Sequence, residues 1–310
     1  MDIDLTNPIF HDEAAATTHM EADRWPDEVN CPLCGSLNVH KMGGKTQNGM
    51  FLCNDCRDKF TVRTGTIFER SHIPLHKWLL ATHLMAASKK SVSALQLQRM
   101  LGLGSYRTAW FMCMRVREAM KPNTRSPLGG EGKIVEADES YFGGKETNKH
   151  VSKRRKGNIG GKGKQVVFAL VERDGHSHSF RVANVSGDEL RPLIVTHTSR
   201  KSSLMTDQGG QYYHVGKEFA RHESVNHGTD EYVRGDAYTN TAESRFALMK
   251  RAVNGAHHSI SEAHLPRYLA EWDFKWNTRK MKDGERAARA LKGAEGKRLT
   301  YRQPREATHD

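Results

Sequence analysis

Two cysteine pairs constrain the fold of this chain more than any other feature. Cys31-Pro-Leu-Cys34 and Cys53-Asn-Asp-Cys56 are separated by the 18 residues 35–52. This spacing fits the pattern of two Cys-x2-Cys pairs that is typical of tetrahedral zinc. Four thiolates would close the coordination shell, so the expected Zn²⁺ ion is structural, and losing it should unfold so short a segment. Two incidental pairs, or a redox Cys-x-x-Cys, are the alternatives.

The fifth cysteine and the N-terminal residues bear on the cellular compartment of the protein. Cys113 lies between two methionines in a helical pattern and is interpreted as a small core residue. Paired thiols at metal-binding spacing indicate a reducing compartment such as the cytoplasm. The acidic stretch at residues 1–28 has the wrong charge for a signal peptide, and the sequence has no apolar run of about 18 residues that would span a membrane.

The net charge points to the kind of partner. The chain has 48 Lys and Arg residues against 36 Asp and Glu, a formal charge of +12. A cationic surplus favours a polyanion, because each neutralised phosphate releases counterions. A surplus that serves only solubility is the alternative reading.

Residues 71–124 have a helical texture. Residues 91–101 and 105–120 are two amphipathic stretches joined by Gly102-Leu103-Gly104, the layout of a helix-turn-helix. Tyr106 and Arg107 would then lie at the exposed start of the second helix, where base edges are usually contacted. A purely structural helical linker explains the same pattern.

The segment 130–280 alternates between strand and helix patterns. Strands are predicted at 133–137, 165–172, 179–185, 203–206 and 222–226. Helices are predicted at 188–199, 210–220, 241–253 and 262–277. This order predicts an α/β fold, a mixed sheet with helices packed on its faces.

The whole chain is therefore expected to consist of five regions. They are a disordered acidic tail (1–28), a zinc ribbon (29–70), a helix-turn-helix-like DNA-binding segment (71–124), a catalytic domain (130–280) with a basic insertion (145–164), and a charged C-terminal tail (281–310).

Two aspartates come at the ends of predicted strands. Asp138 ends the first strand and Asp207 the fourth, and the two strands can be neighbours in the sheet. Carboxylates at one sheet edge suit Mg²⁺, which retains waters and accepts phosphate oxygens. The flanking Glu136 and Glu139 are predicted bystanders, since neighbouring strand residues point to opposite faces.

Glu243 is the candidate third carboxylate, and it has a competing explanation. Asn240 and Glu243 also fit a helix capping box. The 35 residues between Asp207 and Glu243 favour the site interpretation, as does Lys250, which lies seven residues, or two helical turns, further on. Three carboxylates would hold two divalent ions, the arrangement used for in-line phosphoryl transfer.

The insertion 145–164 is rich in glycine and cations. It contains Lys153, Arg154, Arg155 and Lys156 next to each other. We predict a segment that orders on binding phosphates. A solvated insertion and a nuclear-localisation signal are the alternatives.

Together these motifs resemble the zinc-ribbon DDE transposases of bacterial insertion sequences, the ISXO-like group. The resemblance extends from about Cys31 to Arg279. It includes the cysteine pairs, Phe60-Thr-Val-Arg-Thr-Gly-Thr-Ile-Phe, Glu136-Ala-Asp-Glu-Ser-Tyr-Phe-Gly-Gly-Lys, Thr206-Asp207, Asn240-Thr-Ala-Glu243 through Lys250-Arg251, and Leu265-Pro-Arg-Tyr-Leu through Trp276-Asn277. One departure is Arg245-Phe246, where members of the group often have a bulky aromatic pair.

The resemblance implies a ribonuclease-H-like core with a triad matching Asp138, Asp207 and Glu243. It implies cleavage at the terminal inverted repeats of an insertion sequence and joining of the 3'-hydroxyl to target DNA, with two Mg²⁺ or Mn²⁺ ions. Lys250 and Arg251 would contact DNA, and a homodimer or larger assembly would hold both ends, in a bacterial cytoplasm near the nucleoid. A non-catalytic DNA-binding regulator and a metal-dependent nuclease are the rival interpretations.

Overall fold

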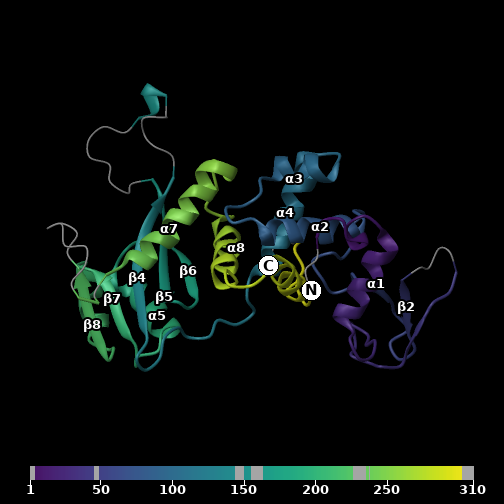
Figure 1. The fold of residues 1–310 in the computed structure, drawn as a ribbon, viewed down its shortest axis with the longest axis horizontal. Helices are drawn as coiled ribbons and strands as arrows, with labels where there is room; N and C mark the ends of the chain where they lie inside the picture. Colours follow the sequence, from purple (N-terminus) through teal and green to yellow (C-terminus); the bar gives the residue numbers. More distant parts are fainter. Residues whose placement is uncertain are drawn as a thin grey trace, which may run out of the picture. The chain divides into compact units, whose positions relative to one another are not determined.

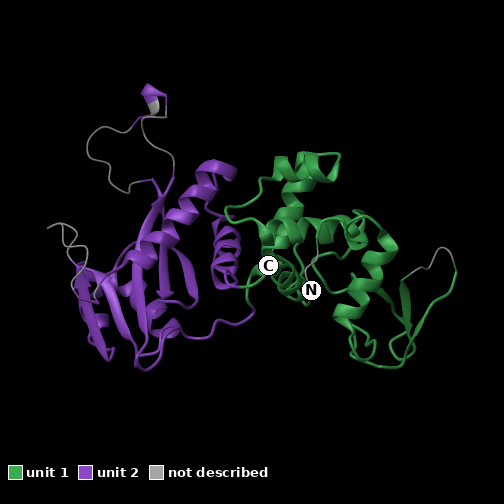
Figure 2. Cartoon of the chain, in the orientation of Figure 1, with its two compact units in different colours: residues 1–122, 281–310 green, residues 123–280 purple. Residues whose placement is uncertain are grey.

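The chain divides into two compact units. Unit 1 comprises residues 1–122 together with 281–310, and unit 2 comprises residues 123–280 (Figure 2). The computed structural model describes residues 4–44, 49–143, 150–154, 163–225, 235–236 and 238–301. No helix within these residues combines the length and the apolar character needed to cross a lipid bilayer.

The cysteine-rich part of unit 1 forms a small antiparallel sheet. Its strands are β1 (Val39–Lys41), β2 (Met50–Cys53) and β3 (Lys59–Thr61), in that order. The core of this sheet is aromatic. The rings of Phe51 and Phe60 stack with centroids 5.4 Å apart, and Trp25 packs edge-on against both. Three aromatic side chains are a small core, so the sheet needs further stabilisation.

The expectation of a disordered tail at residues 1–28 is wrong for the residues that the structure describes. Glu13–Arg24 form helix α1, after a short 3-10 turn at Pro8–Phe10. Asp12 caps α1 by accepting a hydrogen bond from the Ala15 amide at 2.7 Å. Phe10 and Met20 are buried. The many acidic residues make the weakly apolar face of α1 hard to recognise in the sequence. In the structure this face packs into unit 1.

The helices of unit 1 contain the turn expected between residues 101 and 105. They are α2 (Leu75–Ala87), α3 (Ala94–Leu101) and α4 (Tyr106–Met120). Gly102 ends α3 with a left-handed φ of 59°, which glycine adopts without strain. Ser105 caps α4 by accepting a hydrogen bond from the Thr108 amide. Leu97 faces inward and is 0% exposed, whereas Leu95 is 51% exposed.

The C-terminal segment is also more ordered than a tail. Asp283–Lys292 form helix α9, which packs on α2, and Ala290 and Leu291 of this helix are buried. The Ile67 amide then donates to the Ala294 carbonyl at 3.2 Å. Further along, the Tyr301 ring packs edge-on against Phe111 of α4. Residues 283–301 therefore fold against unit 1 and are not a free tail.

Unit 2 is built on a five-stranded mixed sheet. Its strands are β4 (Ile134–Phe142), β5 (Gln165–Glu172), β6 (Ser177–Val182), β7 (Ser203–Asp207) and β8 (Arg221–Val225), in the spatial order β6-β5-β4-β7-β8 (Figure 1). β4, β5 and β6 are antiparallel neighbours, whereas β7 and β8 run parallel to β4. The α/β class is confirmed, and the sheet has the ribonuclease-H-like arrangement that the resemblance implies.

The two faces of the sheet are covered by different helices. Val135 and Ala137 of β4 belong to the apolar core under α5 (Gly187–His197). Phe142 packs instead against Phe246 of α7 (Asn240–Ala252) and Trp272 of α8 (Leu265–Asn277). Because strand side chains alternate, the even-numbered residues of β4 face α7 and α8, and the odd-numbered residues face α5.

Two elements differ from the sequence prediction. β4 continues to Phe142, since β5 pairs with it as far as Gln165, so Asp138 lies inside the strand and does not end it. The helix predicted at 210–220 is reduced to a 3-10 turn, η4 (Gly210–Tyr212), and the single turn α6 (Tyr213–Gly216). The glycines in this segment disfavour a longer helix.

Candidate active site and metal centre

Asp138 and Asp207 come from neighbouring parallel strands. β4 and β7 pair from Ile134↔Ser203 to Glu136↔Met205. The same register continued by two residues sets Asp138 across from Asp207, which is the last residue of β7. Neighbouring strands are about 4.8 Å apart. The two carboxylates therefore meet at the edge of the sheet where β7 ends, just beyond the last residues that pair β4 with β7.

Glu243 reaches the same edge from α7. It lies in the first turn of this helix, which packs on β4 and β5. The competing capping box needs Asn240 as the N-cap residue. The N-cap is Thr239 and has no side-chain cap hydrogen bond, and Asn240 is already the first helical residue. The helix start therefore does not follow the capping-box pattern.

Electrostatics show that the three carboxylates are close together. Burial, and then the negative charges of Glu139, Asp207 and Glu243, raise the pKa of Asp138 to about 7. Glu139 acts in both directions, because its carboxylate raises this pKa while its backbone amide lowers it by hydrogen bonding. A carboxyl with so high a pKa is destabilised when it is ionised. A bound cation would relieve that destabilisation.

The raised pKa of Asp138 can be tested by thermal unfolding of zinc-loaded protein that is free of Mg²⁺ and Mn²⁺. Its folded pKa of about 7 exceeds the ordinary 3.8. The folded state keeps the Asp138 proton to a higher pH than the unfolded state does. The free energy of unfolding therefore falls as the pH rises between those two values. At pH 8, Asp138→Asn is expected to melt several degrees higher, at about 2–4 °C per kcal/mol gained.

The comparison at pH 5 is the internal control. At pH 5 the folded carboxyl is still protonated but the unfolded one has already ionised, so only part of the destabilisation has developed, and scanning calorimetry should find a clearly smaller difference between the two proteins than at pH 8. Added Mg²⁺ at pH 8 should raise the melting temperature of the wild type but not of the variant. A variant less stable than wild type at pH 8 would contradict the pKa assignment.

Glu139 lies on the other face of β4, as strand alternation predicts. Its carboxylate accepts hydrogen bonds from the Tyr212 hydroxyl and from Gln211 Nε2. Burial and the charge of Asp207 raise its pKa, opposed by these hydrogen bonds. Glu139 is thus within electrostatic reach of the site, and the term bystander understates its role.

Glu136 faces α7, on the same side of β4 as Asp138, and it too is more than a bystander. It is 0% exposed. Its carboxylate accepts hydrogen bonds from Arg173 Nε at 2.6 Å and from the Ala242 amide at 2.9 Å. The i, i+2 spacing of Glu136 and Asp138 is the sequence signal for this shared face, because alternate residues of a strand point to the same side.

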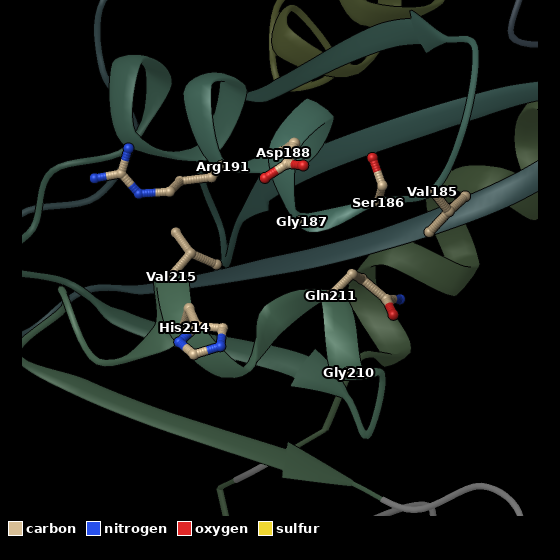
Figure 3. A pocket seen from close by; sticks show the side chains of 9 residues that line it. All are labelled: Val185, Ser186, Gly187, Asp188, Arg191, Gly210, Gln211, His214 and Val215. Atoms are coloured by element: carbon tan, nitrogen blue, oxygen red, sulfur yellow. The ribbon is translucent and has the colours of Figure 1, made fainter.

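A pocket adjoins the site on the α5 face. It has a volume of about 480 Å³ and lies between the start of α5 and the η4–α6 turns (Figure 3). Gln211, which donates to Glu139, forms part of its wall. Asp188 and Arg191 line it on the α5 side. The pocket is therefore connected to the acidic edge through one side chain.

The residues that are predicted to contact DNA are distributed over several elements. Lys250 and Arg251 are exposed on α7, and seven residues, about 10 Å along the helix, separate Glu243 from Lys250. Tyr106 is 53% exposed at the start of α4. The Arg107 guanidinium lies 4.0 Å from the centre of the Tyr301 ring.

Only part of the basic cluster in the insertion can be placed. Val151–Lys153 form a 3-10 turn and Arg154 is exposed. Arg155 and Lys156 lie outside the described residues.

The four paired cysteines come together at one point. Their sulfurs all lie within 4.8 Å of one another, with Cys31–Cys56 at 3.8 Å and Cys34–Cys53 at 3.6 Å. Sulfurs about 2.3 Å from a tetrahedral zinc are separated by about 3.8 Å, so the cluster fits this ion. A hydrogen bond from the Cys56 backbone amide, above all, lowers the pKa of the Cys53 thiol to about 7. Backbone amides lower the pKa of Cys34 and of Cys56, but burial and hydrogen bonds with neighbouring thiols raise both overall, so the shift toward the thiolate that zinc requires is found at Cys53 and not at these two.

Two family models match this chain. The model described as an ISXO2-like transposase domain matches residues 127–277, which contain the whole mixed sheet with α7 and α8. The model described as a transposase zinc-ribbon domain matches residues 11–59, which include α1 as well as the four cysteines. The helix found in place of the predicted acidic tail is therefore within the matched ribbon region.

Individual relatives are similar over most of the chain. The "Uncharacterized protein in transposable element ISH50" of Halobacterium salinarum is 29% identical over 279 residues, covering 86% of this chain and 91% of that protein. A pre-cleavage Mos1 transpososome and the Mos1 strand transfer complex match with 12% and 14% identity, covering 65% of this chain and 71% and 70% of theirs. Their TM-scores are 0.29 each, too low to support an inference for this chain.

Proposed function

Because the chain is a DDE-type DNA transposase of the zinc-ribbon, ISXO2-like family, we propose that it binds the terminal inverted repeats of an insertion sequence, cleaves the ends and joins the 3'-hydroxyl to target DNA. The observation that carries this proposal is the convergence of Asp138, Asp207 and Glu243 at one edge of the sheet.

These three residues would hold two divalent ions, Mg²⁺ or Mn²⁺. Carboxylate oxygens are the donors that such ions prefer, and the raised pKa of Asp138 marks a concentration of negative charge. When bound, the ions would activate the attacking oxygen and stabilise the leaving oxygen of an in-line displacement. No covalent bond to a side chain is needed, because water and then the DNA 3'-hydroxyl attack phosphorus in turn.

Cations on the chain would hold and align the DNA. Lys250 and Arg251 lie on the helix of Glu243 and can bind phosphates beside the site. Lys153, Arg154, Arg155 and Lys156 would grip the backbone, and Tyr106 and Arg107 of α4 would read the terminal repeats together with the zinc ribbon. Two ends must be cut and joined together, so we expect a homodimer or a larger assembly on DNA.

One assay tests the proposal against its rivals. Zinc-loaded protein is incubated with end DNA and a target plasmid in Mg²⁺ or Mn²⁺. Joined end–plasmid product is expected. Nicking without joining would indicate a nuclease, and binding with neither reaction would indicate a regulator, and either result would overturn the proposal.

Glu243 and Asn240 can be separated by paired substitutions. Glu243→Gln is expected to reduce cleavage by at least about 10²-fold, because losing even an outer-shell partner of a metal costs about 10- to 100-fold. Asn240→Ala removes another polar side chain of the same turn and is expected to cost less than about 10-fold. Initial rates of end cleavage, with circular dichroism to verify folding, measure both. A larger effect of Asn240→Ala would assign the third ligand to Asn240.

A further inference from the structure

We infer that Glu136 and Arg173 are positioning residues that set Glu243 opposite Asp138. The inference rests on the proposed function, because it takes Glu243 as the third carboxylate of the site. It assigns the placement of Glu243 to a buried ion pair between the sheet and the start of α7.

Glu136 provides the cap that α7 does not provide for itself. One carboxylate oxygen of Glu136 accepts from Arg173 Nε at 2.6 Å and from Thr241 Oγ1 at 2.9 Å. The other accepts from the Ala242 amide at 2.9 Å. A carboxylate at a helix N-terminus satisfies free amides and is stabilised by the helix dipole. The first turn of α7 is thus bonded to β4.

Arg173 holds the residues that lead into α7. It follows β5 directly, and its guanidinium donates to the Asp236 carbonyl and to the Tyr238 carbonyl, each at 2.9 Å. The same guanidinium lies 3.5 Å from the centre of the Tyr238 ring. Three donors of one planar group therefore fix the chain before α7, its first turn and β4 relative to one another.

The spacing of residues along β4 explains how the hydrogen bond between Glu136 and Ala242 positions Glu243. Glu136 and Asp138 face the same side of the strand and are about 6.6 Å apart. Ala242, which Glu136 holds, immediately precedes Glu243. The position of Glu243 relative to Asp138 is therefore set over a few bonds by Glu136.

A purely stabilising role is distinguished by a matched control in the same unit. Glu271 of α8 is also 0% exposed, and it accepts from Lys275 at 2.6 Å, as Glu136 does from Arg173. Glu271→Gln removes a buried carboxylate charge of the same kind from a different ion pair. Glu136→Gln removes the carboxylate charge of the positioning pair. Arg173→Lys keeps the positive charge but removes the planar guanidinium with its several donors.

The experiment measures Mn²⁺ binding to the zinc-loaded full chain by electron paramagnetic resonance, together with amide hydrogen exchange in the first turn of α7. Glu136→Gln and Arg173→Lys are expected to weaken Mn²⁺ binding by about 10- to 100-fold and to speed exchange at Ala242. Glu271→Gln is expected to lower the melting temperature comparably and to leave both readouts unchanged.

Equal effects of Glu136→Gln and Glu271→Gln on Mn²⁺ binding would overturn the inference, as would unchanged binding in the positioning variants. If Glu136→Gln does not fold, the milder Arg173→Lys decides. A wild type that binds Mn²⁺ but neither cleaves nor joins DNA would refute the proposed function and not the placement of Glu243.

Discussion

Replacing Asp207 with asparagine is expected to abolish end cleavage and joining together, with a loss of at least about 10²-fold in each. Asp207 ends β7 and lies across from Asp138 in the continued register of β4 and β7. An amide of the same shape preserves packing but lacks the charge that binds a hard divalent ion. Both steps use the same carboxylates, so both are lost, while binding of end DNA in a gel-shift assay should persist.

Two further variants make this result specific. Asp188→Asn removes an exposed acid at the start of α5 in the same unit, and it should leave cleavage unchanged. Asp207→Cys should be inactive with Mg²⁺ and partly active with Mn²⁺, because a thiolate is a poor ligand for the harder ion. Joined product from Asp207→Asn at the wild-type rate would remove Asp207 from the site.

Withdrawal of zinc is expected to unfold the ribbon. Structural zinc in small domains contributes about 10–16 kcal/mol of apparent folding free energy. The aromatic group of Trp25, Phe51 and Phe60 is a small core to set against that free energy. Chelation, or Cys34→Ser, should release the ion and remove hydrogen-exchange protection from β1–β3, with loss of end binding.

The matched control is Cys113→Ala, which removes a buried thiol of α4 that lies outside the cluster. It should retain one zinc per chain. Residues 123–280 form their own compact unit, so their exchange should not change on chelation. Protected ribbon amides in zinc-free protein would show that the cluster is not needed for folding.

The local parts of this protein were predictable because their signals are short in sequence. The cysteine spacing predicts a zinc cluster, since two Cys-x2-Cys turns present their thiols to one point. Strand patterns located the elements of the sheet well, but Asp138 lies inside β4 and not at its end. Whether a strand continues depends on its partner: β5 pairs with β4 as far as Phe142↔Gln165, and no local pattern contains that information.

Acidic residues were the hardest to interpret from sequence. Charge alone suggested a disordered tail at residues 1–28, yet Asp12 caps α1, and Glu13 pairs with Arg63, fifty residues away. Similarly, Glu136 looked like a neighbour of no consequence, although its partners Arg173 and Ala242 lie far along the chain. The structural role of a carboxylate depends on the groups it contacts, and the tertiary fold determines those contacts.

The sequence by itself identified the four cysteines as candidate zinc ligands, the α/β class and which three carboxylates to consider, because residue type and spacing decide those locally. The tertiary structure alone decided how the carboxylates meet. Parallel pairing of β4 with β7 brings Asp138 to Asp207, and the start of α7, bonded to buried Glu136, brings Glu243 to both. These contacts join residues 36 to 106 positions apart, and packing of the sheet and its helices fixes them.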